Sequence, residues 1–176
     1  MPRLVKPSVK FKKSFLKDFI GYQRKTALEY DSWGKYHNKK ILSQDFNGFV
    51  KFLRSQSKGK NLPKGYVPQS VFWLVEGQRF LGLLILRHRL TPKLKRIGGH
   101  IGYEVALKFQ GHGYGNLILK LGLKKAKALG INNVLLTCDI SNVRSKKVIE
   151  LNGGKFAGKT NQGKDLPEKL RYWIKV

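Results

Sequence analysis

Residues Gln110-Gly111-His112-Gly113-Tyr114-Gly115 decide how this chain is interpreted, because they join a predicted strand to a predicted helix. Such a turn leaves several backbone N–H groups at the helix start unpaired, and the positive end of the helix dipole points to the same place. The three glycines lack Cβ atoms, so an anion can approach these amides closely. Gln110 and His112 are candidate side-chain donors at the rim. The segment therefore predicts a phosphate site, although a tight turn without a ligand would show the same glycines.

The sequence before this loop predicts three strands. Apolar runs over residues 71–75 and 80–86 flank Glu76-Gly77-Gln78-Arg79, whose glycine suits a tight turn, so they predict a β-hairpin. A third strand is expected over about 97–107. The sequence after the loop predicts, in order, a helix between Gly115 and Gly130 with Gly130 as its C-cap, a strand over 133–138, a helix over 141–151 and a final strand over 170–176.

Two amphipathic helices are predicted near the N-terminus. Phe11, Phe15 and Phe19, joined by Leu16 and Ile20, recur at helical spacing between lysines. Residues 46–53 repeat the pattern before glycine and proline end it. No internal repeat or long linker divides the chain. We therefore expect one α/β domain over residues 1–176, with a helical part over 1–65 and a core over 71–154.

The charge of the chain is strongly positive. The 36 lysines and arginines stand against 10 acidic residues, which gives a formal net charge of +26. Such a field attracts RNA, DNA and phosphorylated small molecules without identifying one of them. The positive residues are spread along the whole chain, which is typical of a solvated lysine surface. Nonspecific binding of polyanions or RNA is therefore expected.

Other features of the composition narrow the class of protein. The single cysteine, Cys138, lies in an apolar run and is interpreted as a small core residue, with a reactive thiol as the alternative. The four histidines lack acidic or cysteine companions at ligand spacing, so we predict no metal site. The longest apolar run, residues 80–86, is too short to span a bilayer, and no signal peptide is evident. These features favour a cytoplasmic protein without membrane contact, and a homodimer is compatible with them.

Two common phosphate sites fit the glycine loop poorly. A Walker loop ends in Gly-Lys-Ser/Thr, whereas Gly115 is followed by Asn116 and Leu117. A dinucleotide fingerprint needs Gly-x-Gly-x-x-Gly, and the third glycine here comes one residue early. Asp139, at the end of a later predicted strand, keeps a nicotinamide-dependent dehydrogenase as a third-ranked hypothesis.

The pattern that fits residues 110–115 is Gln/Arg-x-x-Gly-x-Gly/Ala. At this loop the chain resembles the GNAT superfamily of acyl-CoA N-acyltransferases, and the resemblance continues through residues 98–105, 135–145, 148–154 and 171–174. It implies a mixed, mostly antiparallel twisted sheet flanked by helices, and acetyl-CoA (coenzyme A) as the cofactor. The glycine loop would cradle the cofactor pyrophosphate.

The resemblance also implies where the rest of the cofactor lies. The fourth and fifth strands of the family splay apart, and the pantetheine arm would pair with backbone near Val105 and Leu107. Asn142 matches the asparagine at the head of the next helix and would bind the arm. Ser145, one turn later, is a weaker candidate.

Proton transfer requires a base for the amine and benefits from an acid for the departing thiolate. His100 and Glu104 are four residues apart on a predicted strand, so they share a face and are candidate bases. Many members of the family carry a tyrosine acid where this sequence has Ile149. Tyr172 is therefore a candidate acid, with sheet packing as its alternative role.

These residues together predict an N-acetyltransferase that moves an acetyl group from acetyl-CoA to a primary amine by direct attack on the thioester. The acceptor would be a small-molecule or peptide amine. The alternative is a strongly basic protein of the same fold that docks on RNA or a ribosomal particle, with or without acetyltransferase activity.

Overall fold

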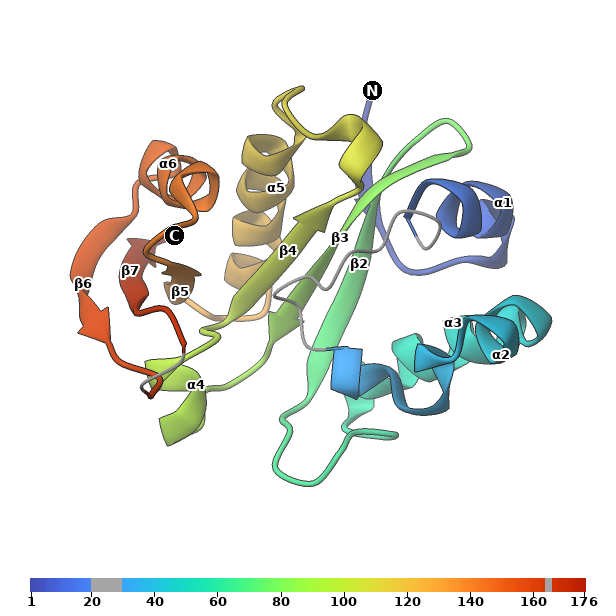
Figure 1. Ribbon diagram of the computed structural model, residues 1–176, viewed down its shortest axis with the longest axis horizontal. Coiled ribbons are helices and arrows are strands. Elements are labelled where there is room, and N and C mark those ends of the chain that lie inside the picture. The colour runs from blue at the N-terminus through green and yellow to red at the C-terminus, as the bar shows by residue number, and fades with distance from the viewer. Residues whose placement is uncertain (20–29, 164–165) are drawn as a thin grey trace.

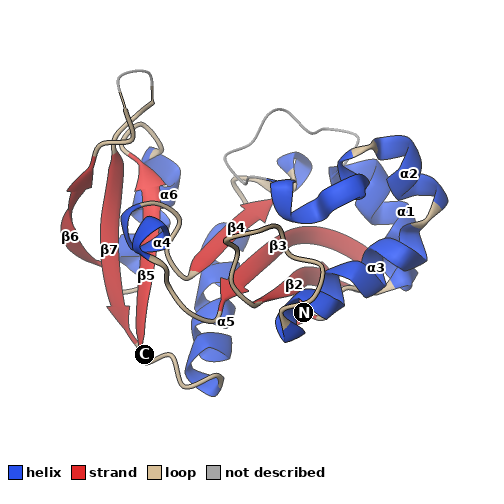
Figure 2. Ribbon diagram, turned by 90° about the horizontal axis from the view of Figure 1, so that it is seen from below, coloured by secondary structure: helices blue, strands red, loops and turns tan. Residues whose placement is uncertain are grey.

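The computed structural model describes residues 1–19, 30–163 and 166–176. Its strands form two sheets that stand apart from each other, as Figures 1 and 2 show from two directions. In spatial order the first contains β1 (Arg3–Val5), β2 (Gln69–Glu76), β3 (Arg79–Arg87) and β4 (Ile101–Val105). The second contains β5 (Asn133–Asp139), β7 (Lys169–Lys175) and β6 (Lys155–Thr160). Neighbouring strands are antiparallel in both sheets.

Helical segments flank the sheets (Figure 1). They are η1 (Val9–Phe11), α1 (Lys12–Ser14), η2 (Phe15–Phe19), η4 (Tyr30–His37), α2 (Lys39–Gln44), α3 (Phe46–Ser55), η5 (Gln56–Lys58), α4 (Pro92–Arg96), η6 (Leu107–Phe109), α5 (Tyr114–Ala128) and α6 (Val143–Leu151). Helix α5 and the N-terminal segments lie on the two faces of the first sheet, and α6 lies beside the second. The predicted α/β architecture, with antiparallel strands and flanking helices, is confirmed. The sheet, however, is divided in two between β4 and β5.

The predicted N-terminal helix is found as the helical run η1, α1 and η2, in which Phe11 and Phe15 are buried. Ile20, which the same prediction included, lies outside the described residues. The second predicted helix is α3, whose Asp45 cap accepts a hydrogen bond from the Gly48 N–H at 2.9 Å. The predicted helical part, residues 1–65, also contributes strand β1.

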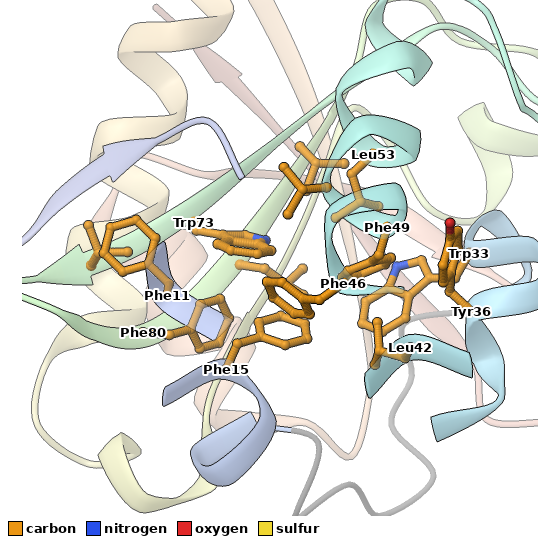
Figure 3. Packing of buried hydrophobic residues seen from close by; sticks show 14 of the residues in the cluster. Phe11, Phe15, Trp33, Tyr36, Leu42, Phe46, Phe49, Leu53, Trp73 and Phe80 are labelled. Carbon is orange, nitrogen blue, oxygen red and sulfur yellow. The ribbon is translucent and has the colours of Figure 1, made fainter. Parts of the chain in front are cut away.

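An aromatic cluster joins these helices to one face of the first sheet (Figure 3). The ring of Phe15 lies 4.8 Å, between centroids, from those of both Trp73 on β2 and Phe80 on β3. Such pairs add about 0.5–1.5 kcal/mol each to the stabilisation from burial alone. The N-terminal helices are thus fixed on the sheet by packing.

Helix α5 covers the opposite face of the same sheet. Gly122 faces β3, where Leu84 leaves no room for a Cβ atom, so the helix packs closely. Strand β3 has Leu83 in the aromatic cluster and Leu84 in the cluster under α5. Because both of its faces are covered, its sequence is a continuous apolar run. Lys120 and Lys124 are exposed on this helix. Gly130, the predicted cap, follows the end of the helix with φ 76°.

Strand β5 follows and alternates between two faces. Leu136 and Cys138 belong to the cluster with α5 and α6, whereas Leu135 and Thr137 lie on the other face, as expected for a strand. The predicted final strand is β7, which lies between β5 and β6. No helix in the described part of the chain is long and apolar enough to cross a membrane.

Candidate active site

The glycine loop has the backbone that the sequence predicted for a phosphate site. Gly111 and Gly113 have φ values of 83° and 78°, and both face open space. Gly113 is the N-cap of α5 and has no side chain that could cap the helix. The first hydrogen bond within the helix runs from the Leu117 N–H to the Gly113 carbonyl at 3.2 Å. The amides of residues 114–116 therefore have no intrahelical acceptor, and the helix dipole adds positive potential. This end of α5 fits a phosphate.

The side chains of the loop fasten it to neighbouring elements. Gln110 donates through Nε2 to the Val105 carbonyl at 3.1 Å and accepts from Arg144 of α6 at 3.4 Å. His112 Nδ1 lies 2.9 Å from the Gln110 carbonyl oxygen. Gln110 therefore links the loop to β4 and α6, a supporting role that the sequence did not predict.

Strands β4 and β5 are joined at one end. The backbone N–H of His100 donates to the Leu135 carbonyl at 2.7 Å, and the Leu135 N–H donates to Nδ1 of His100 at 3.0 Å. The Gly98 N–H donates to the hydroxyl of Thr137 at 2.9 Å. Strand β4 otherwise pairs only with β3 among the described strands, so its other edge faces the gap between the sheets.

A cavity of about 530 Å³ lies at this gap. Its walls include Gly102 and Tyr103 of β4, residues 136–139 of β5, and Asn142 and Ser145 at the start of α6. It extends to the loop before β2, to the end of β3 and to α4. The glycine loop does not line the cavity but adjoins it, because the ring of Tyr103 lies 3.9 Å from the position of a Cβ atom on Gly115.

The start of α6 brings two predicted binding residues to the cavity wall. Asn142 is the N-cap and accepts through Oδ1 from the Ser145 N–H at 3.0 Å, so its amide nitrogen remains as a donor. The hydroxyl of Ser145 lies 3.3 Å from that of Tyr103. Burial raises the pKa of Tyr103 above its ordinary value of 10.0, so this hydroxyl keeps its proton at neutral pH. The sequence did not single out Tyr103, although it lies next to Gly102 in the strand that the resemblance covered.

The other predicted cofactor contacts lie outside the cavity. Val105 ends β4 and is buried, with its carbonyl bonded to Gln110. Leu107 begins η6 and is half exposed. Their backbone contacts with pantetheine stay predictions.

The structure does not bring the three predicted catalytic residues to the cavity wall. His100 is buried, and its ring faces the backbone of β5. Burial lowers its pKa below 6.5, and the charge of Arg87 lowers it further. Glu104 follows Tyr103 on β4 and therefore points to the opposite face. Tyr172 is buried and donates a hydrogen bond to Glu150 at 3.2 Å. Burial, and to a lesser extent this hydrogen bond to Glu150, raises the pKa of Tyr172 to about 12.

Cys138 lines the cavity but is a poor nucleophile. It is 5% exposed and belongs to the apolar cluster with α5 and α6. Burial, and to a lesser extent the negative charge of Asp139, raises the pKa of its thiol to about 11. The thiol therefore keeps its proton near neutrality. The described residues contain no group of three or more metal-ligating side chains.

A comparison with family models matches residues 25–155 to the acetyltransferase (GNAT) domain, which is well over half of the chain. The chain belongs to the GNAT acetyltransferase family. A comparison with curated proteins finds no match. The enzymes of this family depend on acetyl-CoA as the acetyl donor.

Solved GNAT structures share the fold across nearly the whole chain. RimJ from Mycobacterium smegmatis, in complex with CoA-disulfide, has a TM-score of 0.68 at 16% identity, covering 99% of this chain and 82% of that one. The Salmonella typhimurium enzyme that modifies the N-terminal serine of ribosomal protein L7/L12 has a TM-score of 0.61 at 17% identity, covering 99% of this chain and 95% of that one. A chimera of the Vibrio cholerae spermidine N-acetyltransferase with hSSAT has a TM-score of 0.64 at 13% identity, covering 99% of this chain and 95% of that one. At these identities the likeness shows the fold.

Proposed function

We propose that this chain transfers the acetyl group of acetyl-CoA to a primary amine by direct attack on the thioester in the cavity between β4 and β5. The observation that carries the proposal is the position of the cavity, which opens between the diverging strands beside the glycine loop at the start of α5. Two proteins of similar fold act on an N-terminal serine and on spermidine. An amine acceptor is therefore consistent with the architecture.

The residues that would hold the donor lie along one path. The amides at the start of α5 and the helix dipole would bind the pyrophosphate. The amide nitrogen of Asn142 and the wall formed by Ser145 would contact the pantetheine arm, together with the backbone near Val105 and Leu107. Gln110 would keep the loop in place through its bond to β4.

The reaction needs a neutral amine, because an ammonium group has no lone pair with which to attack. The amine nitrogen bonds to the carbonyl carbon, the C–S bond breaks, and the amine proton leaves to a base or to water. Glu104 and His100 stay the predicted bases. His100 has the geometry of a positioning residue, because its Nδ1 already accepts the Leu135 N–H.

Tyr103 is the acid that the cavity suggests for the departing sulfur. Its hydroxyl lies in the wall beside α6, carries a proton at neutral pH and contacts the hydroxyl of Ser145. The sulfur would take the proton of Tyr103, which would regain one from solvent through Ser145. The products are an amide and free CoA thiol, with one proton released overall from an ammonium substrate.

Incubation with labelled acetyl-CoA and a panel of small amines, polyamines and peptides tests the proposal. We expect label in at least one amine, and loss of that transfer in Gly113→Asp, where a negative charge would stand at the phosphate site. Transfer that continues at the same rate in this variant would contradict the assigned loop. Absence of transfer to every amine would contradict the function.

The net charge of +26 favours a second candidate function, docking on RNA or a ribosomal particle. Binding through many lysines weakens steeply as salt is added, because counterions are released. RNA affinity should therefore be measured from low to high salt in the wild type and in Gly113→Asp. Tight, sequence-specific RNA binding that survives in the variant would favour a docking protein over a small-molecule enzyme.

A further inference from the structure

The cavity wall is positively charged on several sides. Its basic side chains are Lys64 in the loop before β2, Arg87 at the end of β3, Lys93 in α4 and Lys169 at the start of β7. Among the described residues that line it, Asp139 is the acidic one. The four basic groups come from four separate elements, so the positive potential surrounds the cavity instead of arising from one helix or strand.

The carboxylate of Asp139 is already compensated. Its Oδ1 lies 2.7 Å from Nζ of Lys169, and both side chains are at least four-fifths buried. A charge in such a close ion pair is a weak partner for a second cation. Asp139 therefore does not offer an open site for an ammonium group, and the net charge of the wall stays positive.

The remaining three basic groups differ in their surroundings. Nη1 of Arg87 donates to the carbonyl oxygens of Gly98 and Gly99, both at 3.1 Å, which fixes the position of the guanidinium. Lys64 and Lys93 are exposed, and neither forms an ion pair with a described residue. Because both line the cavity and are exposed, we place them at its rim.

This potential has two effects on an acceptor. Nearby positive charges disfavour the ammonium form, which supplies the neutral amine needed for attack. They also repel an acceptor with several positive charges and attract one whose amine is followed by carboxylates. A polyamine is therefore a poor match for this wall.

We infer that the acceptor is the terminal amine of an acidic peptide, with the amine in the cavity and its carboxylates between Lys64 and Lys93. This inference rests on the proposed acetyl transfer and names its substrate class. A peptide fits better than a small anionic amine, because two basic side chains on different loops stand at the exposed rim. The chain that follows the amine would meet them on its way out.

The test compares acceptors and charge-reversed variants. One peptide carries acidic residues after its terminal amine, and a second carries lysines at the same positions; spermidine serves as a polycation. The double variant Lys64→Glu/Lys93→Glu reverses the rim. Lys120→Glu/Lys124→Glu changes the net charge equally on the exposed face of α5 and is the matched control. Thermal unfolding verifies that both variants are folded.

We expect the wild type to favour the acidic peptide by at least about tenfold in kcat/KM, which corresponds to about 1.4 kcal/mol. The preference should vanish or reverse in the rim variant and persist in the control. Equal use of the lysine peptide, or equal loss of preference in both variants, would overturn the inference while leaving acetyl transfer intact. If no amine is acetylated at all, the proposed function fails, and the acceptor class fails with it.

Discussion

The Nδ1 atom of His100 accepts a hydrogen bond from the backbone N–H of Leu135 at 3.0 Å. The backbone of His100 donates in return to the Leu135 carbonyl at 2.7 Å, so this residue makes two links at the closed end of the gap, beside the one from Gly98 to Thr137. This arrangement requires an unprotonated Nδ1. The side-chain link between His100 and β5 therefore depends on a neutral histidine.

Replacing His100 with alanine should destabilise the protein by about 1–3 kcal/mol, because the buried Leu135 N–H loses its acceptor. His100→Asn keeps an acceptor oxygen near the same place and should lose less. Urea unfolding of the two variants measures the difference. If His100 is instead the base, His100→Asn will keep its stability and lose the acidic limb of its pH–rate profile, which would contradict a positioning role.

Stability should decrease as the pH is lowered from about 7.5 to 5.5. Burial lowers the pKa values of His88 and His100 in the folded state, whereas the unfolded chain takes up these protons near 6.5. The unfolded state therefore binds more protons in this window. The contribution of the two histidines to the free energy of unfolding is fully present above a pH of about 6.5 and is lost as the pH falls below it. Urea titrations at several pH values measure this slope. His100→Asn should make the slope shallower, and an unchanged slope would show that His100 does not contribute.

Gly113→Ala should cost about 1–2 kcal/mol of stability, because alanine is strained at φ 78°. Gly130→Ala is a matched control, since its φ is 76°, it also faces open space and it lies at the other end of α5. Thermal unfolding should show similar losses for both. Acetyl-CoA affinity should fall only in Gly113→Ala. An equal fall in both would assign the effect to the helix as a whole.

Tyr103→Phe should lower kcat by about tenfold to a hundredfold with a smaller change in the KM for acetyl-CoA, because it removes a proton donor and keeps the ring. Tyr36→Phe removes a buried hydroxyl that donates to Asp45 at 2.8 Å, away from the cavity, and should leave kcat unchanged. Steady-state kinetics measure both. If kcat falls in Tyr172→Phe and is normal in Tyr103→Phe, the result would instead support Tyr172, the acid predicted from the sequence.

Local patterns predicted most of the central elements correctly. The hairpin and α5 follow from short apolar runs and helical spacing around Gly77 and Gly130. Strand β1 was missed because it has three residues, and β6 because its one large apolar side chain, Phe156, is 58% exposed. The short helix α4 was also missed; Thr91 caps it by accepting from the Leu94 N–H at 3.2 Å.

The arrangement of the site depends on contacts between distant residues. Tyr103 and Ser145 are 42 residues apart, and the bond between His100 and Leu135 spans 35 residues. No periodicity in the sequence reports such distances. The glycine loop was predicted because its residues are consecutive and their backbone geometry follows from residue type.

Calorimetric titration of acetyl-CoA tests the central claim most directly. Gly113→Asp and Gly130→Asp add the same charge at positions with nearly the same φ, one at the phosphate site and one at the far end of α5. We predict one site per chain in the wild type and in Gly130→Asp, and no measurable binding in Gly113→Asp. A wild type that binds no acetyl-CoA, or a Gly113→Asp variant that binds it with wild-type affinity, would contradict the account.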